Sequence, residues 1–129
     1  LQNLQTYTAF QAKADRVKND LLSFLLEQKK GGKTVVAYGA AAKGNTLLNY
    51  AGVKTELLPL VADAAKAKQG KYMPGSHIPI VHPDALMALN PDFVLILPWN
   101  IATEVVAQMK SQLPTGTRFV LAVPELMLQ

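Results

Sequence analysis

The sequence predicts an α/β fold with a Rossmann-like, doubly wound, mainly parallel five-stranded sheet and an extra N-terminal helix. Two observations carry this prediction. Short apolar runs alternate along the chain with segments of helical periodicity, and this alternation occurs five times. A turn of small residues, 39–42, joins the first apolar run to a helix, at the place where such sheets bind ligands.

The composition restricts the possible classes. The chain has 129 residues, of which 50% are hydrophobic and 17% charged, so we expect one folded unit and not a disordered segment. There is no cysteine, which excludes disulfides and thiol catalysis and fits a cytoplasmic location. No apolar run approaches the ~20 residues of a membrane span. The net charge of +4 is spread without a basic stripe, so neither nucleic acid nor a membrane is an expected partner.

The first 30 residues read as one long amphipathic helix over 4–30. Apolar residues recur on one face, and Gly31-Gly32 ends the helix after two lysines. We interpret 1–32 as a packing or linker helix and 33–129 as the Rossmann-like domain. The first residue is Leu, which suggests a piece of a longer protein. The apolar face comprises Tyr7, Phe10, Ala14, Val17, Leu21 and Phe24.

The remaining elements follow in order. Apolar or β-branched runs predict strands, and Pro59 sets the start of the second because proline cannot donate to a ladder. The polar stretch 64–77 predicts a loop. The expected strands are 34–38, 59–62, 78–81, 92–97 and 118–123, and the expected helices are 43–51, 83–89 and 101–112, with a turn over 113–116 and Pro124-Glu125 closing the last strand.

The glycine turn partly fits two phosphate-binding patterns. The dinucleotide pattern needs a glycine where Ala41 stands, and the phosphate-loop pattern needs a lysine where Asn45 stands. What remains is a cradle of N–H groups from Ala42 to Asn45, with Lys43 as a point charge and Gly39 and Gly44 allowing close approach. The alternative is a turn whose small residues only let the helix and strand pack closely.

Other candidates lie at the same predicted edge. Asp63 follows the second predicted strand, where an acidic residue binds the ribose hydroxyls in dinucleotide-binding folds. Alternatively, it caps a turn. His77, in the glycine–proline loop, contacts a ligand or only solvent, whereas His82 before a proline reads as a surface turn residue. Trp99 stacks on a ligand or packs at the edge of the core. Asn100 contacts a ligand or caps the helix that follows.

Three segments carry a family resemblance: 38–50, 68–80 and 91–100. They resemble the C-terminal domain of S-adenosylmethionine-dependent C-methyltransferases, which include enzymes acting on nucleotide-linked keto-deoxysugars. The resemblance extends from Tyr7 to Glu125 and departs from the family at 63–66, which leaves the shape around Asp63 open. It implies a preceding zinc-binding segment and a preceding methyltransferase domain that binds S-adenosylmethionine, with no cofactor, metal or catalytic residue in this piece.

The resemblance also implies a role for this domain. In the whole enzyme a base removes a proton beside a ketone, and the enolate carbon takes the methyl group. This domain would hold a nucleotide-sugar or another phosphate-bearing molecule against the upstream methyltransferase domain. A nucleotide or coenzyme A binding module and a structural or dimerising domain are the alternatives. The candidate substrate-binding residues are Gly39, Ala42, Lys43, Gly44, Asn45, Asp63, Lys68, His77, Trp99 and Asn100.

Overall fold

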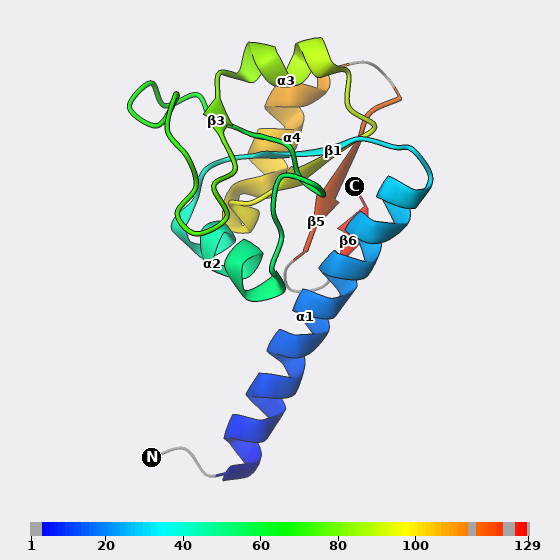
Figure 1. Ribbon diagram of the computed structural model, residues 1–129, viewed down its shortest axis with the longest axis vertical. Helices are drawn as coiled ribbons and strands as arrows, with labels where there is room; N and C mark the ends of the chain where they lie inside the picture. Colours follow the sequence, from blue (N-terminus) through cyan, green and yellow to red (C-terminus); the bar gives the residue numbers. More distant parts are fainter. Residues whose placement is uncertain (1–3, 114–115, 123–125, 129) are drawn as a thin grey trace.

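The computed structural model describes residues 4–113, 116–122 and 126–128, and the side chains of 11–113, 116–122, 126 and 128. One six-stranded sheet in the order β3-β2-β1-β4-β5-β6 forms its centre (Figure 1). The elements are α1 (Leu4–Lys30), β1 (Val35–Tyr38), α2 (Ala42–Ala51), β2 (Val61–Ala62), β3 (Ile80–Val81), α3 (Pro83–Leu89), β4 (Phe93–Ile96), the 3-10 helix η1 (Trp99–Ile101), α4 (Ala102–Lys110), β5 (Arg118–Leu121) and β6 (Met127–Leu128).

The predicted fold class is confirmed. Strands β1 to β5 are parallel, and β1 lies between β2 and β4, with Val35 opposite Phe93. The sixth strand, β6, pairs antiparallel with β5 and was not predicted. It has only two residues, too few to display the alternation that identifies a strand in a sequence.

Several element boundaries differ from the prediction. Strand β2 begins at Val61 and not at 59, because the N–H groups of Leu57 and Leu58 close a turn onto the Lys54 carbonyl. Strand β3 begins at Ile80, since Pro79 has no N–H to donate. Helix α4 begins at Ala102, after the 3-10 turn.

A further group of predictions lies outside the described residues. These are the side chains of Tyr7 and Phe10, the middle of the 113–116 turn, Val123, and Pro124-Glu125. Along the described residues, no helix is long and apolar enough to cross a bilayer.

The sheet is covered on both faces (Figure 1). Alternate residues of β1 and β4 point to opposite sides, so Val35 and Leu95 face one core while Val36 and Val94 face the other. The first core is completed by α1 and α2, through Leu21, Leu25 and Leu48. The second is completed by α3 and α4, through Leu86, Val105 and Met109. Helix α1 therefore shares a core with the sheet.

The first turns of α1 project away from the body of the molecule (Figure 1). Where α1 crosses α2, the Tyr50 hydroxyl donates to Asp15, and Gln11 donates to Tyr50 at 2.7 Å and to Asp15 at 3.1 Å. The Lys18 ammonium lies 4.9 Å from the centre of the Tyr50 ring. The hydrogen bond from Tyr50, with that from Gln11 and the charge of Lys18, lowers the pKa of Asp15 below its ordinary 3.8.

Two glycines let α2 approach the sheet closely. A Cβ on Gly44 would lie 2.6 Å from Cβ of Leu97, and one on Gly39 would lie 2.8 Å from Cγ of Pro98. Gly39 also has φ +92°, which other residues rarely adopt. The close packing suggested for this turn is therefore present.

We predict that Gly44→Ala destabilises the protein by about 1–3 kcal/mol, because its methyl group would overlap a side chain fixed in the core. Urea unfolding measures this change. Gly116→Ala is the control, since a Cβ there meets nothing within 4 Å. Equal stabilities of the two variants would show that α2 does not need this close approach.

The α1–α2 contact predicts a dependence on pH. Because the folded-state pKa of Asp15 is lowered, its contribution to stability is present above pH 3.8 and is lost as the pH falls through the folded pKa. Tyr50→Phe should reduce this acid-induced loss, which unfolding curves between pH 7 and pH 2 would record. Tyr72→Phe, at an exposed tyrosine, should leave the pH dependence unchanged. The same pH profile for both variants would contradict the assignment.

Candidate functional site

The N-terminus of α2 lies at the carboxyl end of β1. Its N-cap, Ala41, is extended and offers no side-chain cap, and the Ala41 carbonyl accepts the N–H of Asn45. The N–H groups of Ala42, Lys43 and Gly44, in the first turn, therefore have no partner within the helix. Together with the helix dipole they favour an anion at this point.

Asp63 ties the turn before α2 to the end of β2. One carboxylate oxygen accepts the Ala40 N–H at 2.8 Å, and the other accepts the Ala65 N–H at 2.8 Å. The second bond makes an Asx turn, as the turn-capping interpretation of Asp63 predicts. Both oxygens thus already have partners inside the protein, which weakens the case for a ribose contact.

Lys68 extends this network from the 64–77 loop. Its ammonium donates to the Ala40 carbonyl at 3.1 Å and lies 3.9 Å from the Asp63 carboxylate. About half of its side chain is exposed, so part of its charge remains available to a ligand. Burial, reinforced by the negative charge of Asp63, raises the pKa of Tyr38 at the end of β1.

A hollow of about 500 Å³, which we call the turn hollow, opens beside this network. The glycine turn and α2 form one side, and the 64–77 loop forms the other. Oδ1 of Asn45 is buried here without a hydrogen-bond partner in the described structure. The lining residues are Ala40, Ala41, Ala42, Asn45, Thr46, Lys68, Met73, Pro74 and Ile80.

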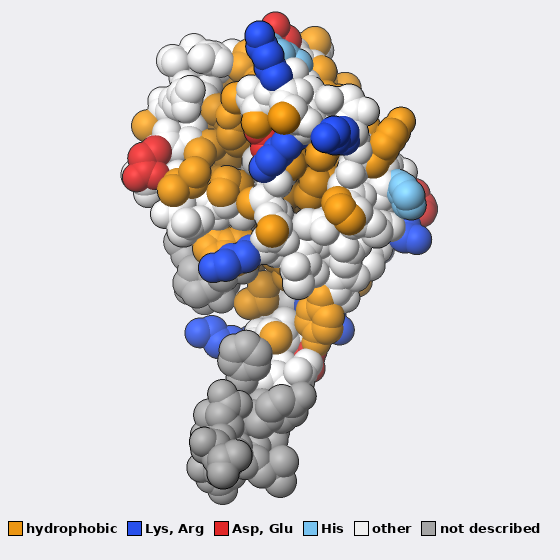
Figure 2. Space-filling model, turned by 90° about the vertical axis from the view of Figure 1, so that its left-hand side faces the viewer, with side chains coloured by type: hydrophobic (Ala, Val, Ile, Leu, Met, Phe, Trp, Pro, Cys, Tyr) orange, Lys and Arg blue, Asp and Glu red, His pale blue; other side chains and the backbone are white. Residues whose placement is uncertain are grey.

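A second hollow of about 470 Å³, the helix hollow, lies on the other side of the first turn of α2. It is bounded by α1, α2 and the start of η1, and most of its surface is carbon. The lining residues are Ala14, Val17, Lys43, Thr46, Leu47, Tyr50 and Trp99. Figure 2 views the molecule from the side of α2 and the β3 loop, and it shows lysine side chains set among apolar ones.

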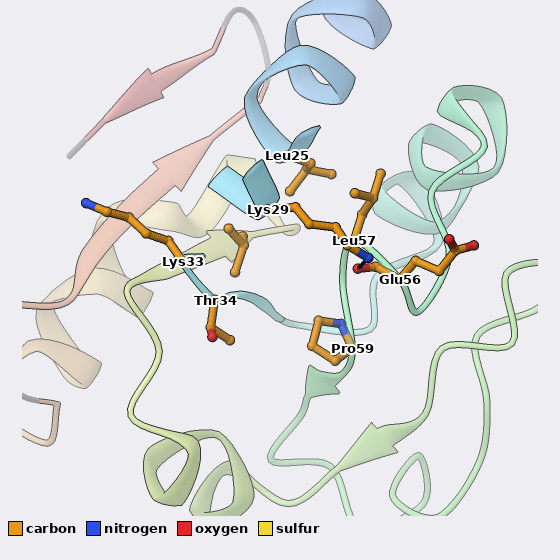
Figure 3. A pocket seen from close by; sticks show the side chains of 8 residues that line it. Leu25, Lys29, Lys33, Thr34, Glu56, Leu57 and Pro59 are labelled. Carbon is orange, nitrogen blue, oxygen red and sulfur yellow. Dashed lines mark hydrogen bonds between the residues drawn. The ribbon is translucent and has the colours of Figure 1, made fainter. Parts of the chain in front are cut away.

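A third, smaller hollow of about 140 Å³ lies at the opposite end of β1 (Figure 3). Lys29 reaches across it and donates to the Glu56 carbonyl at 2.9 Å. Lys33 points away from Lys29 in this view. The charged groups around this third hollow do not converge on one point. The hollow is therefore a weaker candidate for a ligand site than the other two.

The structure brings together some of the predicted site residues and separates others. Ala42, Asn45 and Lys68 line the turn hollow, and Asp63 holds its wall. Lys43 and Trp99 line the helix hollow instead. His77 is exposed with φ +58° and lines none of the three hollows described above.

Three further predictions concerned the two glycines of the turn, Asn100 and His82. Gly39 and Gly44 are buried against Pro98 and Leu97, so they shape the turn. The interpretation of Asn100 as a helix cap is wrong, because the N-cap of α4 is Ile101 and Asn100 lies inside the 3-10 turn. His82 is an exposed surface residue, and its Nδ1 also caps α3 by accepting the Asp84 N–H.

One contact that shapes the site was missed. Nδ2 of Asn49 donates to the Pro74 carbonyl at 2.9 Å, and a Cβ on Gly75 would overlap the Asn49 side chain. This latch holds the loop against α2. A signal exists in the sequence, since Asn49 follows Asn45 by four residues and so lies on the same helix face.

The described residues offer few ligands for a metal ion. Within those ranges, no group of three or more histidine, aspartate or glutamate side chains stands close enough to hold a metal ion. Lys68 is the one titratable side chain that lines the turn hollow. The arrangement offers N–H donors and one ammonium group to an anion, and the described residues that line the turn hollow include no histidine and no carboxylate.

Comparison with known proteins gives two findings. The family described as the C-methyltransferase C-terminal domain matches residues 1–124. The C-methyltransferase NovU of Streptomyces niveus is 36% identical over 119 residues, which are 92% of this chain and 28% of that protein. The chain thus spans little more than a quarter of the length of this relative.

We predict that Asp63→Ala destabilises the protein by about 1–3 kcal/mol, because two backbone N–H groups lose their acceptor. Thermal or urea unfolding measures the change. Asp20→Ala, an exposed position on α1, should change the stability by about 0.5 kcal/mol or less. If Asp63→Ala changed the stability as little as the control does, Asp63 would not hold the two backbone segments together as described above.

Proposed function

The chain belongs to the family of C-methyltransferase C-terminal domains, and we propose that it binds the phosphate-bearing substrate, a nucleotide-linked sugar, of such an enzyme. In this proposal the chain itself is not catalytic. S-adenosylmethionine, which supplies the methyl group, and any zinc would be held by the part of the enzyme that precedes this domain.

The turn hollow is the observation that carries the proposal. The uncapped first turn of α2 and the ammonium of Lys68 border one cavity of about 500 Å³. N–H groups at a helix N-terminus and a lysine are the partners that phosphate oxygens prefer. A diphosphate seated there would accept hydrogen bonds from Ala42 to Gly44 and would draw Lys68 away from the Ala40 carbonyl.

Asn45 supports a ligand that carries hydroxyl groups. Its buried Oδ1 lacks a donor, and a buried acceptor without a partner costs about 1–3 kcal/mol. A sugar or ribose hydroxyl in the turn hollow would supply that donor if the Asn45 side chain turned its oxygen toward the hollow.

The chemistry of the lining supports a binding role without catalysis. Removing a proton beside a ketone needs a base such as histidine or a carboxylate. The side chains that line the turn hollow are apolar or neutral, apart from that of Lys68. In this proposal the base and the methyl donor come from the rest of the enzyme.

Titration calorimetry of the 129-residue chain with uridine diphosphate and with a uridine diphosphate sugar tests the proposal. We expect Lys68→Ala to weaken binding about tenfold, since one charge-assisted hydrogen bond is lost. Lys66→Ala is the matched control, an exposed lysine of the same loop that does not line the hollow.

The other outcomes of this titration would contradict the proposal or favour one of its alternatives. No binding at millimolar ligand, or equal losses in the two lysine variants, would contradict the proposal. Tighter binding of coenzyme A than of the nucleotide-sugar would favour a coenzyme A module instead. A dimer without any ligand response would favour a purely structural domain.

A further inference from the structure

The helix hollow has a different chemistry from the turn hollow. Its walls are the apolar side chains of Ala14, Val17 and Leu47 and the rings of Tyr50 and Trp99. An anionic group of a ligand would find few binding partners there apart from Lys43 at the edge. The hollow suits one or two inserted apolar side chains of a macromolecular partner.

Helix α1 extends beyond this hollow. Gln11 donates a hydrogen bond to Tyr50 of α2, and the seven helical residues before Gln11, 4–10, extend α1 by roughly 10 Å (Figure 1). A partner that covered the helix hollow would also lie beside these turns.

The comparisons indicate which partner this is. The family is defined as a C-terminal domain, and the relative NovU is several times longer than this chain. The additional length of such an enzyme therefore precedes the domain. A catalytic part that preceded the domain would join it at the projecting end of α1, next to the helix hollow.

We propose that the helix hollow, together with the adjoining face of α1, is the docking surface for the catalytic part that precedes this domain. An apolar side chain of that part inserts between Val17 and Trp99. Lys43 in the lining would favour an acidic residue of that part beside the inserted side chain. The proposal rests on the family membership and is independent of the ligand proposed for the turn hollow.

Photo-cross-linking in the complete polypeptide that the gene encodes tests this proposal. A benzophenone amino acid placed at position 17 should cross-link to peptides that precede this domain. The control is position 107, an exposed alanine of α4 on the opposite face of the sheet. Cross-links from position 17 to a second copy only, or a yield no higher than from position 107, would overturn the proposal.

A second variant separates docking from folding and from ligand binding. Val17→Asp places a charge in the hollow, so small-angle scattering should show a larger radius of gyration for the complete polypeptide. The isolated 129-residue chain with the same change should keep its thermal midpoint and its affinity for uridine diphosphate. An unchanged radius would contradict the docking surface, whereas lost nucleotide binding in unmodified protein would contradict only the proposed function.

Discussion

The close approach of α2 to the end of β4 is the constraint on which the site depends. There is no room for a Cβ at Gly44 against Leu97, or at Gly39 against Pro98. Any larger residue would push α2 away from the sheet. Its free N–H groups would then move relative to the loop that carries Lys68, and the turn hollow would lose its shape. The glycines thus act through packing, although they stand in a pattern associated with phosphate binding.

The polar network beside this contact fixes the other wall. The Asp63 carboxylate holds the backbone on both sides of the gap, and Lys68 neutralises it while remaining half exposed. Charge and packing therefore divide the edge of the sheet into two regions. The turn hollow is bordered by the free N–H groups of α2 and by Lys68, which suit a small anion, whereas the helix hollow has little polar surface and suits a protein surface. The first turn of α2 separates them.

The sequence was sufficient for the sheet class, and for α3 even the boundaries, since a proline starts that helix and Asn90 ends it at φ +53°. It was insufficient where single hydrogen bonds decide, as at Leu57 and Leu58 before β2. For the candidate site, the glycine turn was predicted from its pattern and Lys68 from the polar loop and the family resemblance, and the structure places both beside the turn hollow. The position of Trp99 in the helix hollow was not predicted, because the 3-10 turn decides on which side of α2 this residue lies. Helical periodicity places Asn49 on the same face of α2 as Asn45, but it does not encode the loop conformation that brings the Pro74 carbonyl to Asn49.

The proposed function depends on phosphate binding at the first turn of α2. Titration of the ¹⁵N-labelled 129-residue chain with uridine diphosphate, followed by amide chemical shifts, measures this binding residue by residue. We expect the largest shifts at Ala42, Lys43 and Gly44, with smaller ones around Lys68. Shifts centred instead on Lys29 and Lys33, at the opposite end of the sheet, or no shifts at saturating ligand, would contradict it.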